Sequence, residues 1–236
     1  MDKNQRRFAL SGVLLLGLSS VYGPVVYAAK PVDLSQQNVS VLQSFISSPT
    51  ALATKNAVQV QEVSRSVDFK QTLHVRVQET YSGYPVWGGD AIVHIPNGAK
   101  TAKSLTGVVG AAKNNNGSMS GTMYQDLHAD LANTPGYIFS QAQAQKALQM
   151  GIDTYQHKVG GKFAAKDQQG RLIVYIDDSN KAHWAYQVSF YVPPAKASEM
   201  PAMPVYIMDA ISFQVYEQWN DVKNLENVDA FSGGNG

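Results

Sequence analysis

The sequence contains no cysteine among its 236 residues. This absence excludes disulfide bonds as a source of stability, and it also excludes thiol nucleophiles and cysteine-ligated zinc. Charged residues are few, at 16% of the chain, and the formal net charge is +1. Phosphate binding needs clustered Lys and Arg, so we expect no nucleic acid partner. The 44% of hydrophobic residues supplies enough apolar mass for one large core or two small ones.

The common catalytic motifs are also missing from the sequence. It has no His-Glu-x-x-His pair for zinc, no Gly-x-Ser-x-Gly elbow, no P-loop and no dinucleotide-binding glycine fingerprint. Asp126, His128 and Asp130 alternate and could together approach a metal on a strand, but we favour a solvated loop. Asp177-Asp178 precedes Ser179-Asn180, so turn formation explains that carboxylate pair better than catalysis. We therefore expect no enzyme activity, no cofactor and no metal in this chain.

Two further groups of residues have both a structural and a functional interpretation. His74 and His94 fall on neighbouring predicted strands and could face each other, but we favour two histidines on the polar face of a sheet. Tyr81, Tyr84, Trp87 and the aromatic strand 184–191 could line a peptide- or sugar-binding groove. Aromatic residues at period two are more often core and cross-strand pairs, which is the interpretation we favour.

The N-terminus has the pattern of a secretory signal peptide. Three basic residues precede an apolar stretch from Phe8 to Val26, which Gly23-Pro24 interrupts. Small residues then follow, and they predict cleavage after Ala28, with Ala29 as the second choice. The alternative is an uncleaved anchor, but the interrupted run falls short of the roughly 20 residues that a membrane span needs. We expect a secreted or periplasmic protein with no membrane association after cleavage.

Hydrophobic periodicity predicts a helix and antiparallel strands in the first half of the chain. The predicted elements are a helix over 37–48 and strands over 73–77, 86–95 and 104–109. Gly88-Gly89 inside the second strand indicates a bulge or a close backbone approach. Residues 111–121 are small and polar without an apolar period, which favours a linker.

The second half repeats the combination of helix and strands. Ser140 and Gln143 have capping-box spacing, and Gly151 stands where the helix is expected to end. The predicted strands are 172–176, 184–192, 205–208 and 213–219. The sequence therefore predicts an α+β fold with two small subdomains, each an antiparallel sheet with a helix. The predicted segments are a signal peptide 1–28, a first domain 29–110, a linker 111–136, a second domain 137–222 and a tail 223–236.

Residues 73–94 resemble the fungalysin/thermolysin propeptide (FTP) domain. That family has a His-Val-Arg strand, then Tyr, a small turn, Pro-Val and Gly-Gly, and a strand that ends near His. The matching residues here are His74, Arg76, Tyr81, Pro85, Gly88, Gly89 and His94.

A second segment resembles the PepSY domain that follows the FTP domain in thermolysin-type precursors. The matching residues are Tyr186 in a Tyr-x-Val strand, Asp209 in the Asp-Ala turn, and Trp219 and Asn220 at the exit. The PepSY family usually has glycine after that turn, and this chain has Phe213 there. The two resemblances together cover roughly residues 30–222.

The end of the sequence has a third resemblance. Gly233-Gly234-Asn235 is similar to the Gly-Gly-Asn found near the mature start of thermolysin-type proteases, although Phe231-Ser232 replaces the usual Gly-Pro before it. This similarity implies a prosegment–enzyme junction between Asn224 and Phe231. The candidate processing residues are Asn224, Leu225, Val228, Ala230 and Phe231.

These resemblances imply the prosegment of a secreted thermolysin-like zinc metalloprotease. Such a prosegment acts as an intramolecular chaperone and inhibitor of its cognate protease domain, and the zinc belongs to that domain. The second hypothesis is a stand-alone exported binding module or metalloprotease inhibitor acting in trans. The sequence leaves open which protease is served.

Overall fold

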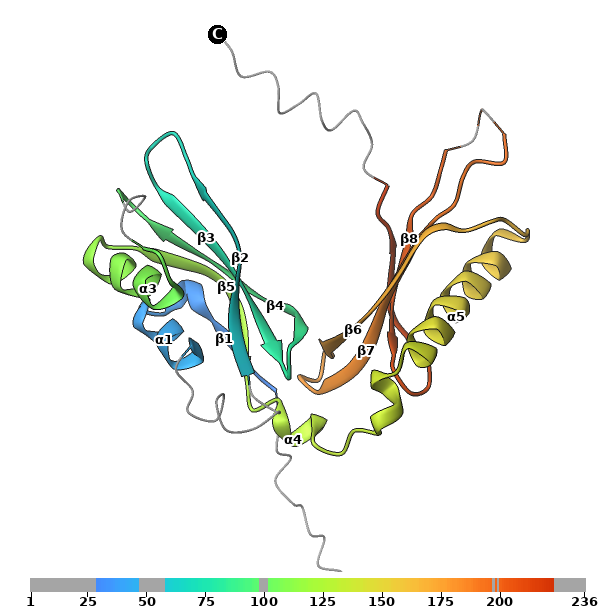
Figure 1. Cartoon of the computed structure of the whole chain (residues 1–236), viewed down its shortest axis with the longest axis horizontal. Helices are drawn as coiled ribbons and strands as arrows, with labels where there is room; N and C mark the ends of the chain where they lie inside the picture. Colours follow the sequence, from blue (N-terminus) through green and yellow to red (C-terminus); the bar gives the residue numbers. More distant parts are fainter. Residues whose placement is uncertain (1–28, 47–57, 98–101, 197, 199, 223–236) are drawn as a thin grey trace, which may run out of the picture.

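The computed structural model describes residues 29–46, 58–97, 102–196, 198 and 200–222. The predicted signal peptide 1–28 and the candidate processing residues 224–231 lie outside the described residues. Within the described ranges the fold is mixed α+β and mostly sheet. Nine strands join in one sheet along the path β1-β5-β4-β6-β7-β8-β9, and β3 and then β2 branch from β4. Figure 1 shows that the sheet divides into two lobes that diverge like a V.

The N-terminal lobe contains five antiparallel strands, two α-helices on one face and one short 3-10 helix. Its strands are β1 Lys30–Asp33, β2 Val58–Val67, β3 Leu73–Tyr81, β4 Tyr84–Ile95 and β5 Ser118–Gln125. Its helices are η1 Leu34–Gln36, α1 Ser40–Ile46 and α3 Leu105–Asn114. Alternate residues of β3 and β4 are buried beneath α1 and α3, as the period-two pattern predicts.

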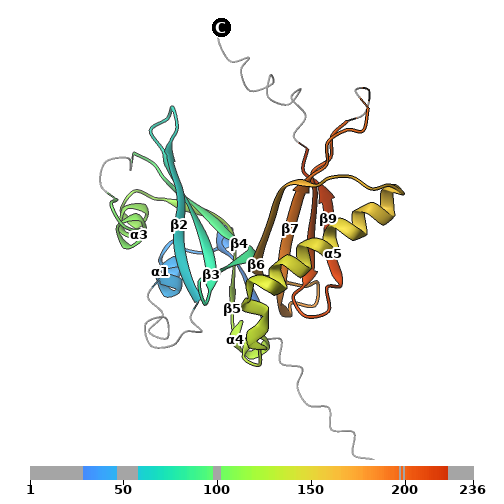
Figure 2. The same ribbon diagram turned by 45° about the vertical axis from the view of Figure 1, so that its right-hand side comes forward.

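The C-terminal lobe contains four antiparallel strands and one long helix. Its strands are β6 Lys166–Ile176, β7 Ala182–Tyr191, β8 Pro204–Asp209 and β9 Val215–Asn220. Helix α5 Gln141–Val159 lies across one face of these strands (Figure 2). Two short helices, α4 His128–Leu131 and η2 Gly136–Phe139, connect β5 to α5.

The lobes join where β4 pairs in parallel with β6. The register pair is Val86 with Val174, and both side chains are fully buried. A hydrophobic core extends through this junction, from Tyr81 and Val86 to the residues beneath α5, such as Trp184 and Tyr186. This shared core fixes one lobe against the other.

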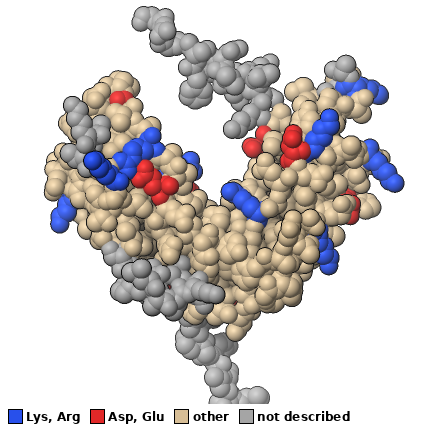
Figure 3. Space-filling model, in the orientation of Figure 1, with Lys and Arg blue, Asp and Glu red and all other residues tan. Residues whose placement is uncertain are grey.

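The helices of both lobes lie on the outside of the V. Consequently the uncovered face of each lobe's sheet turns toward the other lobe (Figure 1). The space-filling view shows a hollow between the lobes, with both basic and acidic side chains along its walls (Figure 3). No helix among the described residues is long and apolar enough to cross a membrane.

The predicted strand over 104–109 is wrong, because these residues begin helix α3. The Ser104 hydroxyl caps the helix by accepting a hydrogen bond from Gly107 N at 3.1 Å. Val108 and Val109 favour a strand by intrinsic propensity, but both are buried against the sheet from one side of the helix. Tertiary packing therefore overrides the local preference.

The predicted linker over 111–121 is also wrong. Its first residues end α3, and its last residues begin β5, which pairs with both β1 and β4. Met119 and Met123 are buried on the helix-covered face. The apolar period is hard to see because Gly121, which lies between these two residues on the same face, has no side chain.

Helix α5 does not end at Gly151 as predicted. It continues to Val159, and Gly160 ends it in the left-handed conformation with φ +68°. Gly151 instead faces the sheet. A Cβ atom there would lie 2.8 Å from Val188 Cγ2. The absence of a side chain at this position lets α5 approach β7 closely.

Gly151→Ala should destabilise the protein even though alanine is the better helix former. The propensity gain is about 1 kcal/mol, and the steric conflict with Val188 should cost about 1–3 kcal/mol. Gly110→Ala in α3 is the matched control, because a Cβ there meets nothing within 4 Å. Urea denaturation should give a lower midpoint for Gly151→Ala and an unchanged or higher midpoint for Gly110→Ala. Equal stabilisation by both changes would contradict this packing argument.

Candidate functional site

The two histidines of the first segment face each other on the uncovered side of the N-terminal lobe. His74 and His94 are direct register partners on β3 and β4, and their Nδ1 atoms are 2.8 Å apart. The Nε2 atom of His74 lies 3.2 Å from Asp68 Oδ2, and that of His94 lies 3.3 Å from Ser120 Oγ. The predicted position of the two histidines on neighbouring strands is confirmed, and the facing arrangement that the sequence left open is the one observed.

The next positions on this face hold an ion pair. Arg76 Nη2 donates to Asp90 Oδ2 at 2.7 Å, and the arginine side chain is about half exposed. Gln78 Nε2 donates to the carbonyls of Val86 and Gly89 at 2.8 and 2.9 Å. Through these two bonds Gln78 holds the irregular part of β4 against β3.

The Gly88-Gly89 pair produces the predicted irregularity. The β3–β4 register shifts between Gln78 and Thr80, and Gly88 has φ +72°. At Gly89 a Cβ atom would lie 2.9 Å from Val86 Cβ and 3.0 Å from Glu79 Oε2. Both predicted features, a bulge and a close approach, are therefore present, and glycine is needed for each.

Glu79 is a buried carboxyl group beside this bulge. Its side chain is fully inaccessible, and Oε2 accepts a hydrogen bond from Tyr124 N at 2.8 Å. Among the described residues Oε1 has no hydrogen-bond partner. Burial raises the pKa of Glu79 to about 8, and the bond from Tyr124 opposes that shift only partly. Glu79 was not predicted from the sequence, although its place after Leu73, Val75 and Val77 on the buried side of β3 was a signal.

Tyr81 and Pro85 belong to the segment 73–94 and lie where it reaches the junction between the two lobes. The Tyr81 hydroxyl is 2.9 Å from His128 Nδ1, and its ring packs on Trp184 of the other lobe at a centroid distance of 5.9 Å. Pro85 pairs with Thr80 across the tight β3–β4 turn. The Tyr186 hydroxyl donates to the carbonyl of Ile138. Through His128 and Ile138 these tyrosines attach both lobes to residues 126–140 between β5 and α5, which we call the linking segment.

Asp209 organises the turn between β8 and β9. Its Oδ1 accepts from the backbone N–H groups of Ile211 and Ser212, and its Oδ2 accepts from the Tyr216 hydroxyl at 2.8 Å. Burial acts to raise the pKa of Asp209, but these hydrogen bonds outweigh it and hold the pKa below its usual range. Phe213 has φ +60°, the left-handed region that favours glycine. The departure from glycine noted in the sequence is therefore a strained position.

The uncovered face of the C-terminal lobe is lined by aromatic rings. Trp87 of β4 stacks on Trp219 of β9 at 5.6 Å, so the two sequence segments meet here. Tyr175 stacks on Tyr216 at 4.8 Å and nearly parallel. Asn220 Oδ1 accepts from Met203 N at 2.7 Å and holds the start of β8 beside the end of β9.

A polar pocket of about 610 Å³ adjoins Trp219 on this face. Arg171 and Gln187 contribute to its wall, and Arg171 Nε donates to Gln187 Oε1 at 2.7 Å. The aromatic rings and this polar wall form a surface on which a protein chain could dock. We call the exposed residues of both uncovered sheet faces the inner surface.

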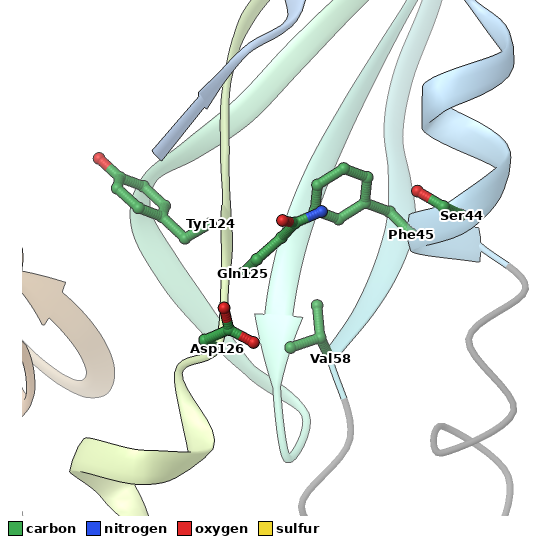
Figure 4. A pocket seen from close by; sticks show the side chains of 6 residues that line it. All are labelled: Ser44, Phe45, Val58, Tyr124, Gln125 and Asp126. Atoms are coloured by element: carbon green, nitrogen blue, oxygen red, sulfur yellow. The ribbon is translucent and has the colours of Figure 1, made fainter. Parts of the chain in front are cut away.

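A smaller pocket of about 240 Å³ lies between α1, β2 and the end of β5 (Figure 4). Its walls include Phe45, Val58 and Gln125, and Asp126 provides the acidic group. Figure 4 shows the Tyr124 ring pointing to the opposite side of β5 from Phe45. One carboxylate among neutral groups does not make a catalytic arrangement.

The trio considered as a metal site in the sequence does not come together. Asp126 lines the small pocket, His128 contacts Tyr81, and Asp130 Oδ2 accepts from Ala182 N at 2.8 Å. Across the described ranges no three or more His, Asp or Glu side chains gather as metal ligands. Instead, His128 and Asp130 attach the linking segment to both lobes. Asp177 accepts from the N–H groups of Ser179 and Lys181, which confirms its role in a turn.

Comparison with known proteins matches the first segment to a family. The fungalysin/thermolysin propeptide motif covers residues 60–102, which correspond to most of β2 and all of β3 and β4.

Curated relatives cover nearly the whole chain. A zinc metalloproteinase, MspA, of Legionella longbeachae is 36% identical over 94% of this chain, and a zinc metalloproteinase of Legionella pneumophila is 32% identical over 98%. A hemagglutinin/proteinase of Vibrio cholerae is 25% identical over 96%. The chain spans 38%, 39% and 33% of the length of these three relatives. The motif and the homology to these zinc metalloproteinases together support a thermolysin-family propeptide.

Proposed function

We propose that this chain is the prosegment of a secreted thermolysin-like zinc metalloprotease, and that it both assists folding of the protease domain and inhibits it. The observation that carries the proposal is the coverage of the Legionella relatives. Almost all of this chain aligns, yet it accounts for only 38–39% of each zinc metalloproteinase. The prosegment has no catalytic residues of its own, and zinc belongs to the protease domain.

The inner surface supports a role in docking the protease domain. It combines an ion pair, stacked aromatic rings and a polar pocket, and the two lobes that carry it share one core. A prefolded, fixed surface of this kind lowers the entropic cost of assembling a large partner on it. The N-terminal lobe would act as the FTP domain and the C-terminal lobe as a PepSY domain.

The test is to refold a denatured thermolysin-like protease of the same organism with and without this chain. The chain should increase the recovered activity and should also inhibit the native enzyme. A folded chain with neither effect would contradict the proposal, and would favour a stand-alone binding module.

A substitution on the inner surface should weaken both effects. Ile92 is half-buried on the uncovered side of β4, between the His74–His94 pair and the Arg76–Asp90 pair. We expect Ile92→Glu to weaken inhibition about tenfold or more, because it replaces an apolar contact with a carboxylate that competes with Asp90 for Arg76, its register partner. Met150→Glu on the exposed side of α5 is the matched control, since that side faces away from the hollow. Equal inhibition constants for both variants would exclude this part of the inner surface from the contact with the protease domain.

A further inference from the structure

We propose that His74 and His94 form a binding site for a divalent transition-metal ion such as Zn²⁺, which both imidazoles ligate through Nδ1. The site lies on the uncovered face of the N-terminal lobe, and each imidazole belongs to a different strand. The inference rests on the geometry of the pair and is independent of the protease-binding role.

The two nitrogens are already close to the spacing that one metal ion requires. At a Zn–N distance of about 2.0–2.1 Å and tetrahedral angles, two ligand nitrogens lie about 3.3 Å apart. The observed separation of His74 Nδ1 and His94 Nδ1 is 2.8 Å, and the ring planes are inclined by 82°. A small rotation of the two rings therefore admits the ion without any change in the backbone pairing.

The outer nitrogens have the partners that metal-bound imidazoles usually have. His74 Nε2 faces the carboxylate of Asp68, and His94 Nε2 faces the hydroxyl of Ser120. Such partners fix the tautomer by accepting the Nε2 proton, and leave the Nδ1 lone pair for the metal. Asp68 is itself held in place, because its Oδ1 accepts from the N–H groups of Lys70 and Thr72.

Proton counting is consistent with both a metal-free and a metal-bound arrangement of the pair. A carboxylate cannot donate, so His74 must carry a proton on Nε2 to bond Asp68. When His94 donates its Nε2 proton to Ser120, its Nδ1 is a bare acceptor. Without metal, the 2.8 Å contact needs one proton between the two Nδ1 atoms, which His94 supplies when its Nε2 instead accepts from the Ser120 hydroxyl. A bound metal ion replaces that proton, and both imidazoles become neutral ligands with their outer hydrogen bonds intact.

The surrounding charges allow a cation at this position. Arg76 is the next residue on the same face of β3, and its charge is compensated by Asp90 on β4. On β2, Arg65 is paired with Glu62, and the turn contributes the carboxylate of Asp68.

The test is titration of the purified chain with ZnCl₂, followed by calorimetry and by NMR of the histidine ring protons. The wild-type chain should bind one equivalent through His74 and His94 and release protons into the buffer. His74→Gln and His94→Gln should each weaken binding at least about tenfold, and Asp68→Asn about tenfold, since outer partners contribute 10–100-fold to metal affinity. His157→Gln at the end of α5 is the matched control and should leave the affinity unchanged.

Affinity for Zn²⁺ should also fall as the pH is lowered, because protons compete for Nδ1. Equal Zn²⁺ affinity for wild type and the double variant His74→Gln/His94→Gln would overturn the proposal. Thermal unfolding of the variants without metal serves as the check on folding. If the double variant is unfolded, the ring-proton shifts of His74 and His94 in the wild-type chain still decide the result. A lack of zinc-induced shifts at both rings overturns the site.

Discussion

The wild-type chain should lose several kcal/mol of stability as the pH rises from about 4.5 to about 8, and Glu79→Gln should abolish this loss. The folded state holds the pKa of this carboxyl at about 8, against an ordinary value of 4.5. Between those two values the unfolded chain has released the proton and the folded chain retains it. The free energy of unfolding therefore falls with rising pH, by about 1.4 kcal/mol per unit at most. Above the folded pKa the loss is complete.

The measurement is urea denaturation of both proteins at several pH values from 4 to 9. Glutamine resembles the neutral carboxyl group in shape and keeps an oxygen for the bond from Tyr124 N. We therefore expect little difference between the proteins near pH 4.5, and a growing advantage for Glu79→Gln toward pH 8. Glu62→Gln is the control, because its carboxylate is partly exposed and its pKa is lowered by the hydrogen bond from Arg65. Parallel curves for wild type and Glu79→Gln would contradict the buried-carboxyl argument.

Gly121→Ala should be the most damaging small substitution in the N-terminal lobe. Gly121 pairs with Ala91 in the middle of the β4–β5 ladder and has φ +121°, a conformation essentially restricted to glycine. A Cβ atom there would lie 2.2 Å from the carbonyl oxygen of Asp90. The strand cannot yield without breaking the ladder, so we expect a loss of about 3 kcal/mol or more.

Gly161→Ala provides the comparison for this change. A Cβ at Gly161 meets nothing within 4 Å, and its φ is not in the left-handed region. Thermal unfolding followed by circular dichroism should show a much lower midpoint for Gly121→Ala, or no cooperative transition. Gly161→Ala should remain within about 0.5 kcal/mol of wild type, as surface changes usually do. A Gly121→Ala variant as stable as Gly161→Ala would mean that β5 is not held in this register.

Much of the sheet could be predicted from local pattern. The alternation of β3 and β4, the strand over 184–192 and the glycine bulge all follow from period two and from the special backbone of glycine. The helix over 105–114 and strand β5 could not, because the buried residues of the helix are valine and alanine and because Gly121 interrupts the apolar positions of β5 between Met119 and Met123. In both cases contacts with distant elements decide the structure, and sequence periodicity does not report them.

Contacts between functional groups were likewise predictable only where the partners lie on elements adjacent in sequence. That His74 and His94 lie on neighbouring strands was predictable, because a tight turn joins the two strands, but their direct pairing depends on the register shift between Gln78 and Thr80. The contact between Tyr81 and His128 and the stacking of Trp87 on Trp219 were not, because they join residues far apart in the sequence. Asp130 is a similar case: its carboxylate holds Ala182 N of β7, a partner that no local motif indicates.

The position of β1 has a consequence for the timing of folding. Lys30, at the start of the described chain, pairs with Gln125 at the end of β5. All of β2, β3, β4 and α3 lie between these partners in sequence, so the edge strand can be added only after β5 has left the ribosome or the export channel. Pairings between such distant segments form slowly, because closing a long loop costs entropy before contacts repay it. We therefore expect β1 to dock late, and the hydrogens of its amide groups to become protected from solvent exchange after those of β3 and β4.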